Sequence, residues 1–222
     1  MVAGTGADSD RAGMYNNRIT ETKRFGIVRT KKKGKIFITI GLLMLTAALC
    51  ITIYNMWDSM RAANAAQDVL SRIETGAEQV EGIPEYLLNP DMEMPTKEID
   101  GNLYVAVIEM PSIGLKLPVI SDWSYDRLKI APCRYSGSAY KDDLVIAAHN
   151  YRQHFGRIGK LRPDDEIILT DMAGNVFRYR VVSMETLKPT AVEEMKSGEW
   201  DLTLFTCTLG GQSRVTIRCE KQ

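Results

Sequence analysis

Cysteine and histidine are scarce in this sequence: its 222 residues include four cysteines and two histidines. Four cysteines are too few for a disulfide framework, and no Cys/His cluster has the spacing of a zinc site. A glycine-rich phosphate loop and internal repeats are also lacking. The sequence therefore predicts no metal and no other cofactor. Two carboxylate pairs, Asp142–Asp143 and Asp164–Asp165, leave calcium open, although charged pairs in turns are usually just solvated.

A net charge is missing too, because 28 basic residues balance 28 acidic ones. The balance hides an asymmetry: residues 1–35 hold nine Lys and Arg against three acidic residues, a net charge of +6, so the rest carries −6. A nucleic-acid partner would need a basic patch on the folded part, and this charge argues against one. Residues 1–30 are polar and show no periodic pattern, so we expect a disordered tail. Together with the lysines that follow, they make up the basic cytoplasmic segment 1–35.

Charge is wholly absent from residues 36–57. As a helix these twenty-two residues would extend roughly 33 Å, enough for the core of a bilayer. A buried core helix is rarely so long without polarity, and a cleaved signal peptide would have a shorter apolar region. The basic cluster before the run places its N-terminal side in the cytoplasm. The pattern predicts a type II anchor in membrane lipid at the cell membrane, with everything beyond Asp58 outside.

The segment 58–100 is predicted to connect the anchor to a folded domain. Apolar residues recur at helical spacing over 58–81 and stop before a Gly-Ile-Pro sequence, which predicts a membrane-proximal helix that packs on the domain or on a partner. Residues 87–100 read as an irregular linker.

Residues 101–222 are predicted to form a mainly β domain, because short strands alternate with turn signals, as in a closed barrel or a sandwich. The expected strands are 103–110, 115–120, 143–149, 166–171, 176–184, 202–207 and 215–219. Short helical segments are expected at 123–131, 155–161 and 193–198, the first capped by Ser121-Asp122.

The last two strands flank a turn with Gly210-Gly211, so they are predicted to pair side by side. That pairing would bring Cys207 close to Arg214. A cation beside a thiol stabilises the nucleophilic thiolate. On this pattern alone the alternatives remain a core cysteine and a solvated arginine.

Three stretches taken together resemble the sortases, the membrane-anchored cysteine transpeptidases of Gram-positive bacteria. T-L-F-T-C at 203–207 is similar to their T-L-x-T-C signature, and Arg214 falls where that family has its essential arginine. L-V-I-A-A-H-N-Y at 144–151 is similar to the strand that ends in their catalytic histidine, here His149, and 155–167 looks like the segment that follows. The resemblance covers about residues 102–219, in the family's order.

The resemblance implies an eight-stranded β-barrel and a transpeptidase. Cys207 would form a thioester with a surface protein cleaved at its C-terminal sorting motif, and an amine of peptidoglycan or a pilin would accept the acyl group. His149 would transfer protons and Arg214 would stabilise the oxyanion. Thr206 is a candidate for lining the substrate groove, as are residues 115–120 and 185–200.

Several alternatives stay open. His154 is expected at the surface or along the substrate, and Arg218 to be solvated or ion-paired. Cys133 and Cys219 could form a disulfide or remain two buried thiols. The sortase class is unresolved. An inactive tethered barrel that binds or scaffolds cell-wall components, or a plain cysteine endopeptidase of the same fold, would also fit this sequence.

Overall fold

The structure is a computed structural model that describes residues 28–74, 83–196 and 199–222. The chain divides into two compact units, Met1–Asn55 and Met56–Gln222. Most of the predicted tail, residues 1–27, lies outside the described residues.

Helix α1 (Val28–Glu74) contains the whole uncharged run. In the first unit the apolar side chains of this run are exposed, Phe37 and Leu42 among them, and the helix is long and apolar enough to cross a membrane. This is compatible with a membrane anchor. The predicted membrane-proximal helix continues from the run without interruption, since neither glycine nor proline occurs between residues 42 and 75. Its predicted end at Glu81 lies outside the described residues.

In the second unit, α1 buries one face. Ala62, Ala66, Val69 and Leu70 are each at most 4% exposed. Ala66 belongs to the main hydrophobic cluster of the domain and Val69 to the second cluster. The helical apolar spacing of this segment therefore serves packing against the domain, as predicted.

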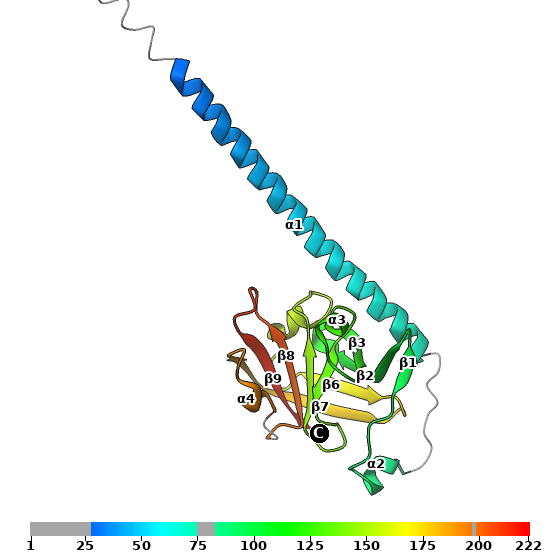
Figure 1. The fold of residues 1–222 in the computed structure, drawn as a ribbon. Coiled ribbons are helices and arrows are strands. Elements are labelled where there is room, and N and C mark those ends of the chain that lie inside the picture. Colours follow the sequence, from blue (N-terminus) through cyan, green and yellow to red (C-terminus); the bar gives the residue numbers. More distant parts are fainter. Residues whose placement is uncertain (1–27, 75–82, 197–198) are drawn as a thin grey trace, which may run out of the picture. The chain divides into compact units, whose positions relative to one another are not determined.

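Eight strands of the described chain close into a β-barrel, which confirms the predicted fold (Figure 1). They pair in the order β2-β3-β4-β5-β8-β9-β7-β6, and β6 pairs with β2 to close the ring. The pairs β3–β4 and β5–β8 are parallel and the others antiparallel. The barrel strands are β2 (Asn102–Met110), β3 (Leu115–Ile120), β4 (Cys133–Ser136), β5 (Leu144–Ala148), β6 (Glu166–Asp171), β7 (Val176–Leu187), β8 (Leu202–Cys207) and β9 (Arg214–Lys221).

The structure contains elements that two of the predictions left out, one in the segment before the barrel and one in the barrel itself. The expected irregular linker contains part of helix α2 (Glu85–Leu88) and strand β1 (Lys97–Ile99), which adds to the edge of β2. Strand β4 was missed, because its sequence C-R-Y-S shows little apolar character.

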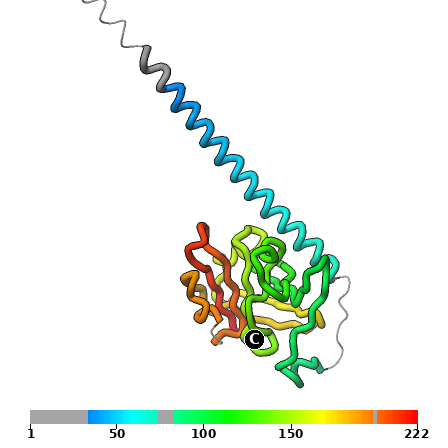
Figure 2. The backbone as a smooth tube through the Cα atoms, viewed as in Figure 1, coloured from blue at the N-terminus to red at the C-terminus, as the bar shows by residue number. Residues whose placement is uncertain are grey.

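Short helices lie between the strands, as the tube drawing of the same view also shows (Figure 2). They are η1 (Pro111–Ile113), α3 (Tyr125–Leu128), η2 (Phe155–Lys160) and α4 (Val192–Lys196). Helix α3 is shorter than predicted and its cap is Ser124, whose side chain accepts a hydrogen bond from the N–H of Arg127 at 3.1 Å. The predicted cap at Ser121-Asp122 was therefore wrong by two residues.

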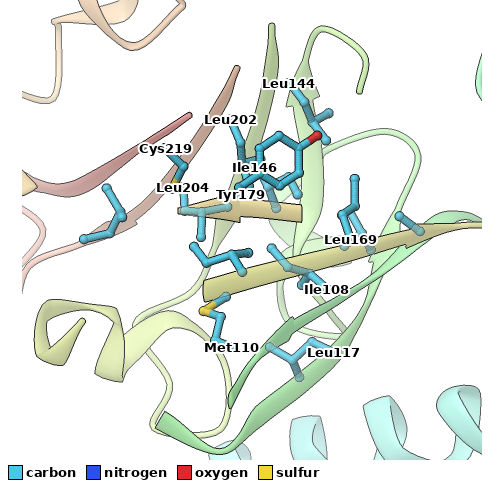
Figure 3. Packing of buried hydrophobic residues seen from close by; sticks show 14 of the residues in the cluster. Ile108, Met110, Leu117, Leu144, Ile146, Leu169, Tyr179, Leu202, Leu204 and Cys219 are labelled. Carbon is cyan, nitrogen blue, oxygen red and sulfur yellow. The ribbon is translucent and has the colours of Figure 1, made fainter. Parts of the chain in front are cut away.

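The main hydrophobic cluster gathers residues from most of the barrel strands (Figure 3). In β7 the buried residues alternate at Phe177, Tyr179 and Val181, as expected where one face meets the core. Strand β5, by contrast, is buried along its whole length. Its residues alternate between the main cluster and a second cluster that includes residues of α1, α3 and α4. A strand buried on both faces reads as a continuous apolar run.

Candidate active site

Cys207 and Arg214 face each other across the last hairpin. Strands β8 and β9 pair antiparallel, and Cys207 is the register partner of Arg214. The turn between them is closed by the N–H of Thr208, which donates to the carbonyl of Ser213 at 2.9 Å. Gly210 and Gly211 have positive φ angles of 87° and 73°, which glycine adopts at little cost. The predicted hairpin is confirmed.

His149 reaches the same place from a different strand. Strands β5 and β8 run parallel, with Ala148 as the register partner of Thr206. His149 and Cys207 directly follow these two partners, so both lie at the same end of two neighbouring strands. Parallel pairing thereby unites residues 58 positions apart in the sequence.

One cavity of about 170 Å³ contains all three side chains in its lining. His149, Cys207 and Arg214 are each partly exposed there. The remaining lining residues are mostly apolar or aromatic: Trp123, Tyr125, Leu128, Tyr135, Ala147, Ala148, Pro189, Val192, Met195 and Phe205. A thiol, an imidazole and a guanidinium in one largely apolar cavity can perform nucleophilic acyl transfer.

The electrostatics of this cavity act most clearly on His149. Its pKa is lowered, first because burial penalises the imidazolium and second because of the Lys129 charge, while Asp58 acts in the opposite direction. The Arg214 guanidinium donates from Nη1 to the carbonyls of Gly211 at 3.0 Å and Ser213 at 3.1 Å. These bonds fix the guanidinium beside the turn, and its planar fork has further donors for a ligand.

Thr206 has a different place from the one predicted. Its side chain is buried, and its hydroxyl donates to the carbonyl of Ala148 at 2.8 Å. It is not in the lining of the 170 Å³ cavity. Thr206 instead ties β8 to β5 one residue before each strand presents its functional side chain.

The prediction of a surface or substrate-lining His154 was wrong, since the side chain is completely buried. It lies against Tyr151, with ring centroids 5.4 Å apart. Burial, with the nearby His149, lowers the pKa of His154 to about 4. A neutral imidazole is an acceptable core residue, and the loop-like sequence around it gave no sign of this packing.

Arg218 is ion-paired, as predicted, but it is not solvated. Its side chain is 3% exposed, and Nε donates to Glu185 Oε1 at 2.6 Å. The other guanidinium nitrogens donate to the Thr203 hydroxyl and to the carbonyls of Glu194 and Met195. Arg218 therefore joins β7, β8 and α4 and does not line the cavity.

The structure also describes the remaining cysteines. All four cysteines are free, so the alternative of two buried thiols holds for Cys133 and Cys219. Burial raises the pKa of Cys133 to about 12 and also raises that of Cys219. Within the described ranges, no three or more His, Cys, Asp and Glu side chains form a group that could hold a metal ion.

Residues beyond the predicted set also shape the cavity. Of the predicted groove walls, the 185–200 connection contributes Pro189, Val192 and Met195, and residues 115–120 contribute nothing to this lining. Trp123 and Tyr135 were not predicted, and both also line a neighbouring open cavity of about 540 Å³. That larger cavity contains none of the three reactive side chains. Only the aromatic character of Trp123 and Tyr135 could have marked them as candidates.

Comparisons with known proteins agree with this geometry. The family model of the sortase domain matches residues 108–222. The sortase D5 transpeptidase of Clostridium perfringens is similar with a TM-score of 0.51 at 17% identity, over 72% of this chain and 96% of that one. Sortase A of Corynebacterium diphtheriae is similar with a TM-score of 0.50 at 19% identity, over 74% of this chain and 84% of that one. At these identities the similarity to the two structures supports the fold alone. Comparison with curated proteins gives no match.

Proposed function

This chain belongs to the sortase family of transpeptidases, and from that premise we propose that it cleaves surface proteins at a C-terminal sorting motif through a thioester on Cys207. The observation that carries the proposal is the single cavity that contains His149, Cys207 and Arg214. The apolar lining suits the side chains of an extended peptide.

In the first half of the reaction, the Cys207 thiolate attacks the carbonyl carbon of the scissile peptide bond. Arg214 donates hydrogen bonds to the oxyanion of the tetrahedral intermediate. The C–N bond then breaks, and the His149 imidazolium gives its proton to the leaving amine. The products of this half are an acyl thioester and a free amine.

In the second half, the amine of peptidoglycan or of a pilin attacks the thioester carbonyl. His149 takes the proton of this amine, the C–S bond breaks, and Cys207 leaves as the thiolate. The new amide bond joins the surface protein to its acceptor, and the enzyme returns to its starting protonation state.

The test uses the full chain in detergent micelles with candidate sorting peptides, with and without an amine acceptor. A covalent adduct on Cys207 and an acceptor-dependent product are expected, and Cys207→Ala should give neither. Cleavage with water alone, even at high acceptor concentration, would indicate an endopeptidase. Binding of peptide or cell-wall fragments with no adduct would refute the proposal and favour a tethered binding barrel.

Thiol chemistry supplies a second measurement, performed on the full chain with Cys50→Ala. Iodoacetamide should modify Cys207 under native conditions, because its side chain is partly exposed. Cys133 and Cys219 are buried with raised pKa values, so they should react only after unfolding. Loss of thioester formation while Cys207 stays unmodified would contradict its assignment as nucleophile.

For the location we propose a single-pass type II membrane protein: a cytoplasmic segment 1–35, a membrane span 36–57, an extracellular helix and linker 58–100, and a catalytic domain 101–222 outside the cell. Support comes from the +6 charge before the uncharged run. Protease added to intact cells should remove the catalytic domain and spare residues 1–35. A cleaved, soluble form as the main species would contradict this topology.

A further inference from the structure

A carboxylate of α1 reaches the neighbourhood of the proposed catalytic histidine. The Tyr151 hydroxyl donates a hydrogen bond to Asp58 Oδ2 at 2.6 Å, across 93 positions of sequence. The Tyr151 ring in turn lies against His149, with centroids 4.9 Å apart and planes tilted by 38°. The three side chains thus form a continuous series from α1 to the cavity.

Asp58 is fixed in its place by the structure around it. Its side chain is 20% exposed, and it also forms an ion pair with Arg61 at 3.2 Å. The following turns of α1 bury Ala62 and Ala66 against the domain. Near the end of the helix, Arg72 pairs with Asp100 at 3.0 Å. The turn of α1 that bears Asp58 is therefore anchored on the same unit as the cavity.

Tyr151 contacts three side chains that restrict its position. It contacts His149 and His154, and its hydroxyl bonds to Asp58. A hydrogen bond to a charged acceptor is stronger than a neutral one. This bond limits rotation of the Tyr151 ring, and the ring limits the orientations open to the His149 imidazole.

We propose that Asp58 is a positioning residue for acyl transfer: it holds Tyr151, and Tyr151 holds the imidazole of His149. The inference rests on the proposed function, in which His149 moves the proton. Catalysis is sensitive to such placement, because a misplaced proton donor loses much of its advantage.

Besides its hydrogen bond to Tyr151, Asp58 acts on His149 through its negative charge. The charged and titratable groups around His149 are Lys129 after α3, Asp58 on α1, the buried His154 before η2, and Cys207 and Arg214 in the cavity. Burial and Lys129 lower the pKa of His149, and Asp58 raises it. Asp58 therefore favours the protonated imidazole that the first half of the reaction needs.

The test compares variants of the full chain in detergent micelles. Asp58→Ala and Tyr151→Phe should each lower kcat about tenfold and leave KM within about twofold. Each substitution loosens the orientation of the His149 imidazole but removes no contact with the substrate. The double variant should be no worse than Asp58→Ala alone, because Tyr151→Phe removes the same hydrogen bond. Asp58→Glu should restore part of the rate. The matched control is Asp68→Asn on the same helix, an exposed carboxylate paired with Arg72, which should leave kcat unchanged.

A second readout is independent of turnover: titration of the His149 ring by NMR. Asp58→Asn should lower the pKa of His149, whereas Asp68→Asn should not. If the wild type is active, and folded Asp58→Ala has the same kcat and the same His149 titration as the wild type, this inference is overturned and the proposed function stands. A wild type without thioester formation whose His149 still responds to Asp58→Asn would refute the proposed function and retain the contact.

Discussion

Arg214 and Arg218 lie four residues apart on β9, yet the structure predicts opposite consequences for their removal. Arg214 lines the cavity, is partly exposed, and donates to two carbonyls of the adjacent turn. Arg218 is buried and donates to groups on β7, β8 and α4. Substituting each by alanine separates a catalytic contribution from a structural one.

For Arg218→Ala the cost falls on stability. The substitution leaves the Glu185 carboxylate and the Thr203 hydroxyl without their partner, as well as two carbonyls of α4. Removing one member of a buried charged network costs about 3 kcal/mol. In a domain of this size that lowers Tm by about 10 °C. The turnover of the molecules that remain folded should stay within about tenfold of wild type.

For Arg214→Ala the cost falls on catalysis. Its two bonds to the turn are partly exposed, so their loss should cost about 0.5–1 kcal/mol of stability. Loss of one oxyanion donor costs roughly 3 kcal/mol of transition-state stabilisation, or about two orders of magnitude in kcat. Arg214→Lys should recover only part of this, because an ammonium lacks the planar fork.

The assay measures thioester formation with a sorting peptide per mole of folded protein, with the folded fraction and Tm taken from circular dichroism. Two results would refute the reasoning: a stable Arg218→Ala with turnover as low as that of Arg214→Ala, or an Arg214→Ala that keeps full turnover.

Two further predictions concern stability. The pKa of His154 is about 4 in the folded state and about 6.5 when unfolded, so the unfolded chain binds the extra proton between these values. The free energy of unfolding should therefore fall by about 3 kcal/mol as pH drops from 6.5 to 4, and urea titrations of a folded His154→Gln variant should show a smaller fall; equal slopes would contradict the assignment. Gly137 has a φ of 73°, and a Cβ there would overlap the carbonyl of Asp143. Gly137→Ala should lose at least about 2 kcal/mol in the same titrations, and Gly101→Ala, with a φ of 75° and open space around it, about 1 kcal/mol.

The sequence predicts the local parts of the site better than the distant ones. The strands β8 and β9 and their turn lie within twenty residues, so composition and turn signals suffice to pair Cys207 with Arg214. The pairing of β5 with β8 joins segments far apart in the chain, and no local pattern in either strand specifies it. His149 was connected to Cys207 through the resemblance of its surroundings to the sortases.

The errors share one physical cause, which is packing between distant elements. Arg218 is buried because α4 places two backbone carbonyls over its guanidinium, and this contact has no signature in β9 itself. His154 is completely buried, and the backbone of Ala62 on the distant helix α1 lies close enough to affect its pKa. Arginine is mostly exposed in folded proteins, and a polar residue in a loop-like segment is usually exposed too, so the sequence favoured the wrong environment for Arg218 and for His154.

The register of β5 and β8 explains why His149 and Cys207 share one cavity, to which the β8–β9 pairing adds Arg214. Ala147 and Phe205 are register partners, and both belong to the second hydrophobic cluster, outside the main one. Side chains alternate along a strand, so His149 and Cys207, two residues further on, lie on this same face. Ala147, Phe205, His149 and Cys207 therefore line the cavity from one face of this parallel pair. A slip of one residue in β8 would turn Cys207 toward the main cluster, where burial raises thiol pKa values as it does at Cys219. The hydrogen bond from Thr206 to Ala148 fixes this register at the last pair before the site.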